Sequence, residues 1–527
     1  MKIYQTNTLI IGAGSAGCVL ANRLSKDPAR EVVLLEAGGR DNWHWIHIPV
    51  GYLYTMGNRK TDWCYQTTPQ TGLNGRQLNY PRGRVLGGSS SINGMIYMRG
   101  QAEDYDEWGA GWSWHDVLPY YKRSECYHRG SDDYHSDKGE LKVQSQRLKW
   151  SILETFKSVC EDSGFEDCPD FNKGDNSGIG YFEVNQNRGR RLSSAGAFLH
   201  PITHRSNLKV FTHATTEELL FEGASCVGAR TTIEGKPAII RADRVILAAG
   251  AIGTPAILER SGIGRESILQ KHGIPVRTCL PGVGENLQDH LQIRLQYQLA
   301  SGDTLNQRTN SWLGRIRMIL EYAFNRSGPL SMAPSQLGAF FKSCESLSRA
   351  DLEFHIQPMT ADKLGIDLHS FPGMTASVCH LRPTSRGSTH ISGKAARQVP
   401  IINPNYLSTE SDRFVALNAI RKTRDLMDHP ELKQFGPTEY SPGRHLQTDG
   451  ELINATGDIA TTIFHPVGSA KMGSEKDPEA VVSRRLKVFG HEGLFIADAS
   501  VMPKITSGNT HAPVVMIAER LAHWLNE

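Results

Sequence analysis

The sequence lacks the patterns that mark metal centres, disulfide frameworks and membrane spans. Its nine cysteines form no CxxC pair and no HExxH occurs, so neither cysteine nor histidine spacing predicts a zinc site, and we expect no metal. An odd number of scattered cysteines is typical of reduced thiols, which favours a cytoplasmic protein. No uninterrupted apolar run of about 18 residues appears, so no transmembrane span is expected.

A strong charge imbalance is also missing. The 58 basic and 55 acidic side chains leave a formal net charge of +3, and no basic block is interleaved with aromatic residues. Proteins that bind nucleic acid present such a surface. We therefore expect no nucleic-acid partner. The sequence also contains no internal repeat and no low-complexity segment.

What the chain does have is length and apolar content. With 527 residues, 39% of them hydrophobic, it can bury a large core and is expected to form two or more domains. One aromatic stretch, "WHWIHIPVGYLYTM" (43–56), is either a loop packed on that core or a contact for a membrane or a partner. Peripheral contact with the inner membrane thus stays open.

The first segment, "NTLIIGAGSAGCVLANRLSKDPAREVVLLEAGG" (7–39), predicts a strand, a tight turn, a helix and a second strand. Gly12 permits the turn, Gly14 lets a pyrophosphate approach the backbone, and Gly17 lets the helix pack closely on the strand. Glu36 ends the second apolar run, 19 residues after Gly17, where an acid accepts hydrogen bonds from a ribose. The segment therefore predicts a dinucleotide site, for FAD or NAD, rather than a signal peptide.

Three later segments have the composition of cofactor-binding elements. The run "GRVLGGSSSINGMIYMRG" (83–100) is rich in small residues and predicts a loop that wraps a ligand; the alternative is a flexible surface connection. The run "RVILAAGAIGTPAILERSGIG" (244–264) predicts a strand, a turn at the nucleotide and a helix. In "GLFIADASVMP" (493–503), Asp498 follows an apolar strand and can anchor a cofactor indirectly.

Together these motifs resemble the glucose-methanol-choline (GMC) family of FAD-dependent alcohol oxidoreductases. The runs 83–100 and 250–264 fit its two signatures, and "PGVGENLQDH" (281–290), "LRPTSRG" (381–387) and "NPNYL" (403–407) resemble further landmarks. The similarity extends from about residue 8 to residue 524. It is greatest to the choline dehydrogenase-like alcohol dehydrogenases.

The resemblance implies an α/β fold with a Rossmann-like FAD-binding domain and a substrate-binding domain. The FAD-binding domain is expected to be discontinuous, over residues 1–150, 195–300 and 462–527. Residues 151–194 and 301–461 are expected to form the substrate-binding domain, an antiparallel β-sheet covered by helices. The strand-like runs "GSTHIS" (387–392) and "VPIINPNYL" (399–407) are expected at the edge of that sheet.

The resemblance also implies which residues hold FAD. Some relatives carry a flavin-linked histidine in the serine-rich loop, but this chain has Ile92 there, so we expect non-covalent FAD. The candidate cofactor-binding residues are Gly12, Gly14, Ser15, Gly17, Glu36, Ala37, Arg84, Gly87, Gly88, Asn93, Gly94, Ile96, Thr216, Ala249, Gly250, Asp498, Ala499, His511 and Pro513.

Two histidines are the candidate catalytic residues. His465 in "FHPVGSAKMG" and His511 in "SGNTHAPVVMIAE" begin two blocks that the family places beside the reactive edge of the flavin. Family members have His/Asn or His/His there, and this chain has His/His. We expect His465 to take the hydroxyl proton as hydride moves to flavin N5, and His511 to hydrogen-bond the developing alkoxide. Because two adjacent imidazoliums repel, at least one should stay neutral.

The predicted reaction is oxidation of a primary alcohol to an aldehyde by an FAD-dependent alcohol dehydrogenase. Electrons would pass to a quinone or another non-oxygen acceptor. The alternatives are an alcohol oxidase that makes H2O2, an FAD-containing hydroxynitrile lyase and a non-catalytic flavoprotein. The segments 332–341 and 351–360 are expected to line the substrate pocket, with Phe340, Phe354 and Gln357 as candidate contacts. A quaternary amine such as choline would need an aromatic or acidic cage. Glu353 could contribute to one, but strand alternation could equally turn it outward, so choline is not the favoured substrate.

Overall fold

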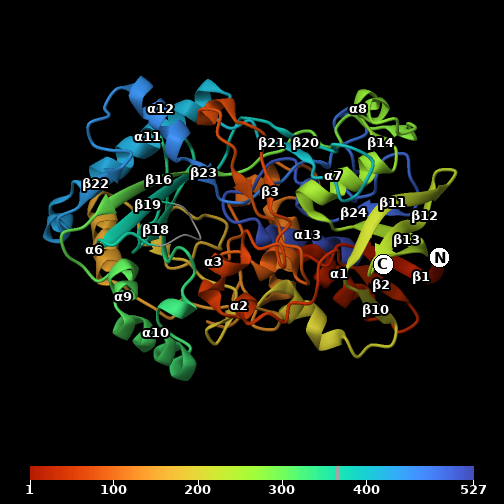
Figure 1. Cartoon of the computed structure of the whole chain (residues 1–527), viewed down its shortest axis with the longest axis horizontal. Coiled ribbons are helices and arrows are strands. Elements are labelled where there is room, and N and C mark those ends of the chain that lie inside the picture. The colour runs from red at the N-terminus through yellow and green to blue at the C-terminus, as the bar shows by residue number, and fades with distance from the viewer. Residues whose placement is uncertain (363–367) are drawn as a thin grey trace.

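The computed structural model describes residues 1–362 and 368–527, and two seven-stranded sheets dominate it (Figure 1). The first sheet has the order β10-β2-β1-β13-β12-β11, with β24 also paired to β13. Its strands are β1 (Lys2–Ile11), β2 (Val32–Leu35), β10 (Leu208–Phe211), β11 (Ala214–Glu222), β12 (Ser225–Ile233), β13 (Lys236–Leu247) and β24 (Leu494–Ile496). β1 pairs in parallel with β2 and β13, whereas β12 is antiparallel to both its neighbours.

The second sheet is antiparallel and has the order β22-β16-β19-β18-β17-β7, with β23 beside β16. Its strands are β7 (Gly178–Tyr181), β16 (Leu291–Gln298), β17 (Leu337–Phe341), β18 (Leu352–Gln357), β19 (Gly373–His380), β22 (Thr438–Ser441) and β23 (Thr461–Thr462). The antiparallel sheet that the family resemblance implies is thus present. β16 lies at the end of the range 195–300 that we assigned to the FAD-binding domain, yet it pairs in this second sheet. The domain limits stay a prediction.

Thirteen α-helices lie among the described residues. They are α1 (Ser15–Leu24), α2 (His44–His47), α3 (Tyr52–Thr55), α4 (Ala102–Asp106), α5 (Trp114–Ser124), α6 (Ser151–Asp162), α7 (Gly250–Arg260), α8 (Glu266–Lys271), α9 (Leu305–Asn310), α10 (Trp312–Asn325), α11 (Glu410–Met427), α12 (Asp449–Ile459) and α13 (His511–Trp524). Across the described ranges, no helix combines the length and the apolar content that crossing a bilayer requires.

The remaining short strands form five two-stranded pairs among the described residues. These are β3 (Tyr65–Gln66) with β4 (Asn79–Tyr80), β5 (Glu125–Tyr127) with β6 (Leu141–Val143), β8 (Gln186–Asn187) with β9 (Arg190–Arg191), β14 (Ile263–Gly264) with β15 (Thr278–Cys279), and β20 (Ser388–His390) with β21 (Ile401–Asn403). The expectation for 387–392 and 399–407 is corrected here. These runs do form strands, but the strands pair with each other and β20 contacts α7, so they do not extend the large antiparallel sheet.

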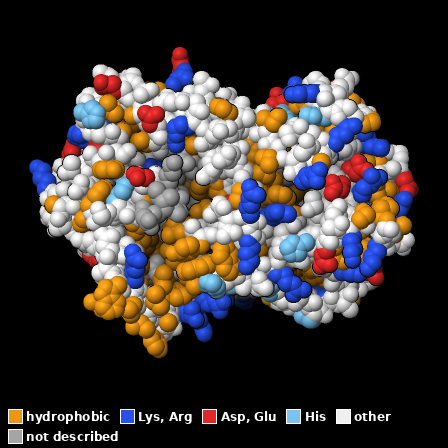
Figure 2. Space-filling view, viewed as in Figure 1, with side chains coloured by type: hydrophobic (Ala, Val, Ile, Leu, Met, Phe, Trp, Pro, Cys, Tyr) orange, Lys and Arg blue, Asp and Glu red, His pale blue; other side chains and the backbone are white. Residues whose placement is uncertain are grey.

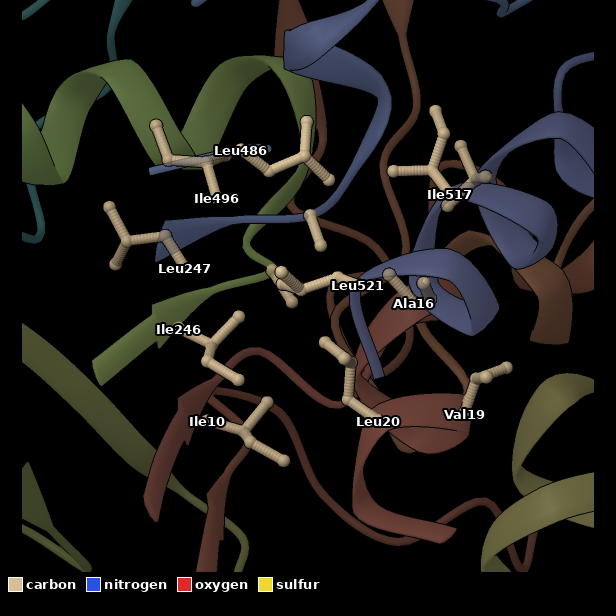
Figure 3. Close-up of a cluster of buried hydrophobic side chains, with 14 of the residues drawn as sticks. Ile10, Ala16, Val19, Leu20, Ile246, Leu247, Leu486, Ile496, Ile517 and Leu521 are labelled. Atoms are coloured by element: carbon tan, nitrogen blue, oxygen red, sulfur yellow. The ribbon is translucent and has the colours of Figure 1, made fainter. Parts of the chain in front are cut away.

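The core beside the first sheet joins segments from both ends of the sequence. Figure 3 shows Ile10 of β1 and Ile246 of β13 facing side chains of the helix layer, including Leu20 of α1 and Leu521 of α13. All four side chains are fully buried. A buried ion pair joins the same two helices, with Nη2 of Arg23 2.6 Å from Oε1 of Glu519. Because α1 and α13 pack on one another, the start of α13 is held next to the turn that follows β1.

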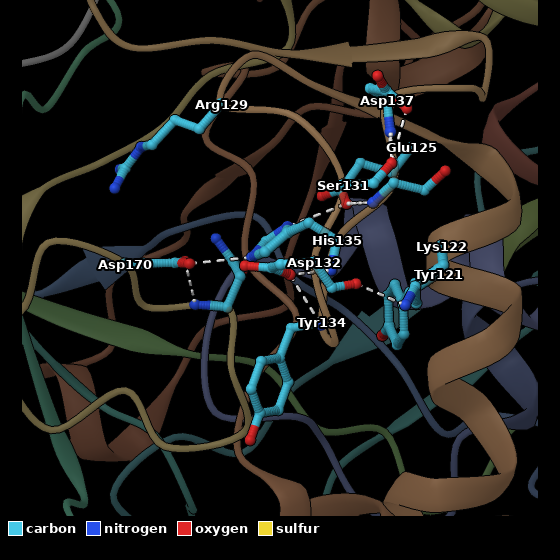
Figure 4. A network of polar contacts seen from close by, with 12 residues as sticks. Tyr121, Lys122, Glu125, Arg129, Ser131, Asp132, Tyr134, His135, Asp137 and Asp170 are labelled. Carbon is cyan, nitrogen blue, oxygen red and sulfur yellow. Dashed lines mark hydrogen bonds and ion pairs between the residues drawn. The ribbon is translucent and has the colours of Figure 1, made fainter.

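A buried polar network anchors the segment that follows the 83–100 loop (Figure 4). His135 Nδ1 lies 3.0 Å from Glu125 and Nε2 lies 2.9 Å from Asp170. Burial opposes protonation of this imidazole, but the hydrogen bonds to Asp170 and Glu125 outweigh it and raise the pKa of His135. Arg99, at the end of the loop, donates to the same Glu125 at 2.8 Å. The network therefore fixes one end of the loop that carries many of the predicted cofactor residues.

Candidate functional site

A cavity of about 310 Å³ lies between the two sheets. The surface is hollowed between two lobes in Figure 2. Seventeen of the predicted site residues line this cavity: Gly12, Gly14, Ser15, Glu36, Ala37, Gly88, Asn93, Gly94, Ile96, Thr216, Ala249, Gly250, Gln357, His465, Asp498, Ala499 and His511. Residues that are far apart in the sequence thus meet in one place.

The turn after β1 forms a narrow cradle of backbone. Gly12 has φ +105°, and a Cβ there would lie 2.5 Å from the Ala248 carbonyl oxygen. Gly88 has φ +54°, and a Cβ there would lie 2.6 Å from Cα of Gly14. Side chains at these positions would clash with backbone that cannot move aside. The glycine loop and the 83–100 loop therefore approach each other directly. The backbone N–H groups at the start of α1 can then donate hydrogen bonds to a phosphate.

The carboxylate of Glu36 is buried at the end of β2. Its Oε2 accepts a hydrogen bond from the Ala13 N–H at 3.1 Å, and its Oε1 accepts one from the Gly38 N–H at 2.8 Å. Burial outweighs these hydrogen bonds and raises the pKa of Glu36 to about 7. Each oxygen keeps a further lone pair that a ribose hydroxyl can use.

Asp498 holds the start of α7 in place. Its Oδ2 accepts hydrogen bonds from the Gly250 N–H at 2.9 Å and from the Thr254 hydroxyl at 2.6 Å, while its Oδ1 accepts from the Ser500 N–H. A carboxylate at this position matches the positive end of the helix dipole. The side chain of Asp498 therefore fixes the turn at 248–250, whose residues line the cavity.

Four predicted cofactor residues do not line the cavity but support residues that do. A Cβ on Gly17 would lie 1.8 Å from the Gly12 carbonyl oxygen, so this glycine permits the close packing of α1. Gly87 donates its N–H to the Ala13 carbonyl at 2.8 Å. The Arg84 guanidinium lies 4.8 Å from the centre of the Trp63 ring. Pro513 is buried in the first turn of α13.

The structure corrects the expectation that Phe340 and Phe354 line the substrate pocket. Strand residues alternate between faces, and Phe354 points away from the cavity, packing 4.7 Å from Phe341 between ring centroids. Phe340 lies behind the lining residues, 5.0 Å from Phe171. On β18 the face toward the cavity carries His355 and Gln357 instead.

His465 has a defined tautomer. Its Nδ1 lies 3.1 Å from Nδ1 of His290, whose Nε2 lies 3.0 Å from the Leu381 carbonyl oxygen. A carbonyl only accepts, so Nε2 of His290 carries the proton and its Nδ1 accepts from Nδ1–H of His465. Nε2 of His465 is therefore unprotonated, and its lone pair can accept a hydrogen bond. Nδ2 of Asn509, which can only donate, lies 3.1 Å from that same Nε2, in agreement with this tautomer.

Burial keeps these imidazoles neutral. It lowers the pKa of His465 well below its ordinary value, with the neighbouring His290 adding to the shift, and it lowers the pKa of His290 to about 4. His465 thus presents an unprotonated Nε2 to the cavity at neutral pH, as a general base must.

His511 is the first residue of α13 and lies on the cavity wall. Its Nδ1 lies 3.0 Å from the Ser15 hydroxyl, and its Nε2 has no hydrogen-bond partner within the part of the chain that the structure describes. Burial, with a further contribution from Arg191, lowers the pKa of His511 to about 4. When Ser15 donates to Nδ1, Nε2 carries the proton and can donate it to a ligand.

Three polar residues near His465 were missed by the sequence analysis. They are His290, Asn509 and His355. Both ring nitrogens of His355 are buried and unpartnered among the described residues, although Glu353 lies 3.3 Å away. The sequence could have predicted His355. Side chains alternate between the two faces of a strand, so a strand that places Gln357 in the pocket also places His355 on the pocket side.

The cavity fits FAD, the cofactor that the resemblance implies. It combines the glycine cradle at the start of α1 with the Glu36 carboxylate at the ribose end. Polar atoms that lack partners among the described residues also line it, and they include Oγ1 of Thr216, Oδ1 of Asn509 and Nε2 of His511. Buried polar atoms of this kind indicate an absent hydrogen-bonding ligand.

Comparison with known proteins gives a consistent result. Two family models, both described as GMC oxidoreductase, match residues 6–292 and 383–518. The chain is 38% identical to "Alcohol dehydrogenase [acceptor]" of Pseudomonas putida, over 98% of this chain and 94% of that protein. It is 37% identical to mitochondrial choline dehydrogenase of Homo sapiens, over 98% of this chain and 88% of that protein.

Solved structures agree with these sequence matches. Pyridoxine 4-oxidase from Mesorbium loti superposes with a TM-score of 0.89 at 29% identity and covers 99% of both chains. A variant of the formate oxidase of Aspergillus oryzae gives a TM-score of 0.92 at 25% identity, over 99% of this chain and 98% of that one.

Proposed function

The chain belongs to the GMC oxidoreductase family, flavin enzymes that act on alcohols, and from this premise we propose that it oxidises a primary alcohol to an aldehyde with His465 as the general base. The observation that carries the proposal is the unprotonated Nε2 of His465 in the wall of the cavity. An alcohol hydroxyl is too weak an acid to lose its proton unaided near neutral pH, so a positioned base is required.

FAD would be held by the glycine cradle, Glu36 and the turn that Asp498 fixes. When bound, it supplies the acceptor for the hydride, N5 of the isoalloxazine ring. Ile92, on the cavity wall, has no group that can bond to a flavin. This supports non-covalent binding.

The proton path uses residues of this chain. The alcohol hydroxyl would displace the Asn509 amide from Nε2 of His465 and transfer its proton there as the hydride leaves the adjacent carbon. His290 accepts from Nδ1–H of His465 and stabilises the imidazolium that forms. Nε2–H of His511 would donate to the developing alkoxide.

The substrate is proposed to be an uncharged primary alcohol. Among the described residues, the carboxylates that line the cavity are Glu36 and Asp498, and both are engaged at the nucleotide end. The rest of the lining includes Tyr52, Met56 and Phe464. A quaternary ammonium would find aromatic rings there but no carboxylate among the described residues of this part of the wall, because Glu353 lies behind His355 on the same face of β18, so choline is not favoured. The Pseudomonas putida relative is named an alcohol dehydrogenase that uses an acceptor, which supports an acceptor other than oxygen.

Anaerobic mixing with a panel of aliphatic, aromatic, polyol and amino alcohols tests the reaction. We expect a primary alcohol to bleach the flavin absorbance and release an aldehyde. A flavin that stays oxidised while a cyanohydrin is cleaved would identify a hydroxynitrile lyase instead. If a quinone or a dye reoxidises the bleached enzyme quickly and oxygen reoxidises it slowly, the enzyme is a dehydrogenase. Fast reoxidation with release of H2O2 would identify an oxidase.

The role of His465 is tested by His465→Ala. We expect the rate of flavin reduction to fall about 10²- to 10⁴-fold, the usual contribution of a general base, with flavin content retained. The matched control is His204→Ala, because His204 is exposed on the surface. Equal flavin reduction by the two variants would contradict the proposal.

A further inference from the structure

Helix α10 carries an unusual solvent-facing surface. Six of its large apolar side chains are exposed, among them Phe324 at 82%, Trp312 at 69% and Leu313 at 62%, together with Ile316, Ile319 and Leu320. Figure 2 shows apolar side chains gathered at the lower left, where Figure 1 places α10. Soluble monomers rarely expose a contiguous apolar patch of this kind.

The helix has two apolar sides. Met318 and Tyr322 are buried against the rest of the protein, so the exposed residues are not its core-facing stripe. At about 100° per residue, the exposed apolar positions span an arc of roughly 140°. This second apolar face has no packing partner within the described residues.

Charge is arranged along the edges of that face. On the same helical projection, Arg315 and Arg317, both exposed, lie at its two opposite borders. Nearby Arg308 is paired with Asp303, and Arg326 follows the helix directly. Aromatic and aliphatic side chains bordered by arginines are typical of a helix that lies in the surface of an anionic bilayer.

The apolar surface continues toward the segment 43–56. The turn at Pro49–Gly51 contacts the turn at Pro329–Ser331, which in turn contacts α10. Tyr54 of α3 is also exposed and packs against Trp45, with ring centroids 4.2 Å apart and the rings tilted by 32°. The aromatic stretch singled out in the sequence is thus joined to α10 through the turn at Pro329–Ser331.

We propose that α10, together with Tyr54, docks this protein on the surface of an anionic lipid bilayer. The 14 residues of α10 are about 21 Å long at 1.5 Å per residue, and the two arginine borders orient the helix in the plane of the membrane with its apolar face inward. A second copy of the chain fits this surface less well, because pairing two such faces would bring Arg315 and Arg317 of both copies together, with Glu321 as the single acidic residue of each α10. The inference does not depend on the proposed reaction.

Sedimentation with vesicles tests the docking. We expect the flavin-loaded protein to sediment with vesicles that contain phosphatidylglycerol, less with phosphatidylcholine alone, and less again at high salt. Leu320→Glu should lower the partition constant by about tenfold or more, because it places a charge in the apolar face. Arg317→Glu should weaken binding only to the anionic vesicles.

Phe414→Glu is the matched control, since Phe414 is 54% exposed on α11, outside the patch. Each variant is also assayed with a soluble dye acceptor, and unchanged turnover shows that the fold is intact. The proposal would be overturned by absence of binding to anionic vesicles, by equal binding of Leu320→Glu and Phe414→Glu, or by a dimer that Leu320→Glu converts to monomers.

Discussion

Nδ1 of His290 and Nδ1 of His465 lie 3.1 Å apart, and the Leu381 carbonyl on the far side of His290 determines which of the two imidazoles donates. A single backbone oxygen thus sets the protonation pattern of the proposed base. His290 does not line the cavity. It is therefore a positioning residue, which acts on the substrate only through His465.

Replacing His290 with phenylalanine should slow the proposed reaction without loss of flavin. His465 loses its acceptor at Nδ1, so the tautomer with a free Nε2 is no longer favoured, and we expect kcat to fall about 10²-fold. Stopped-flow flavin reduction measures the effect, with KM and flavin content as internal checks. His290→Gln keeps an acceptor oxygen and should restore part of the rate. An unchanged kcat in the phenylalanine variant would show that His465 needs no such partner.

Activity and stability should both decline on the acid side, with stability declining first, from about pH 6.5 downward. Burial lowers the pKa of His290 and of His511 from 6.5 to about 4. Between these values the unfolded chain binds more protons than the folded chain, so stability falls as pH drops below 6.5, by up to about 1.4 kcal/mol per pH unit for each histidine. Urea unfolding at a series of pH values measures this slope.

The acid limb of kcat/KM should lie below 6.5, because burial also lowers the pKa of His465. An acid limb at or above pH 6.5 would mean that the pKa of His465 is not lowered in the enzyme during turnover, which would contradict the burial of this side chain.

Glu36→Ala should release the cofactor. The variant loses the carboxylate that organises the Ala13 and Gly38 N–H groups and that a ribose hydroxyl would contact. We expect FAD affinity to fall about tenfold or more, since a hydrogen bond to a charged group contributes about 1.5–3 kcal/mol. Flavin absorbance after gel filtration measures retention. Glu31→Ala, at an exposed position, is the control and should keep its flavin.

Leu521→Ala should destabilise the fold strongly. Leu521 is fully buried between α13 and the first sheet, where Figure 3 shows it near Leu20. Truncating such a residue leaves a cavity and costs about 2–5 kcal/mol. Chemical unfolding of the flavin-loaded protein measures the loss. The same substitution at Leu313, which is exposed, should change the free energy of unfolding by less than about 0.5 kcal/mol. A similar loss in both variants would refute the packing argument.

The sequence was most informative where a motif constrains the backbone. The βαβ unit at residues 2–35, the turn at 248–250 and the placement of His465 and His511 in one cavity all follow from glycine spacing or from family blocks. Glycines carry this information because only they fit the close approach of Gly12 to Ala248 and of Gly88 to Gly14.

The sequence was least informative where side chains from distant segments meet. His290 lies 175 residues before His465, and nothing local distinguishes it from a core histidine. Phe354 was assigned to the pocket because the segment 351–360 was expected to line it, although only the register of β18 decides which face this side chain takes. The runs 387–392 and 399–407 were recognised as strands, but pairing between strands depends on tertiary contacts that local patterning does not encode.

The contact between His511 and Ser15 joins groups that are 496 residues apart. A nascent chain emerging from the ribosome therefore exposes β1 and α1 long before α13 exists to close the nucleotide cradle. The cradle is complete only once α13 has been synthesised and has packed on α1, so we expect flavin capture to follow the synthesis of this helix. A chain truncated before α13 would lack both a wall of the cradle and the partner that buries the apolar side of α1.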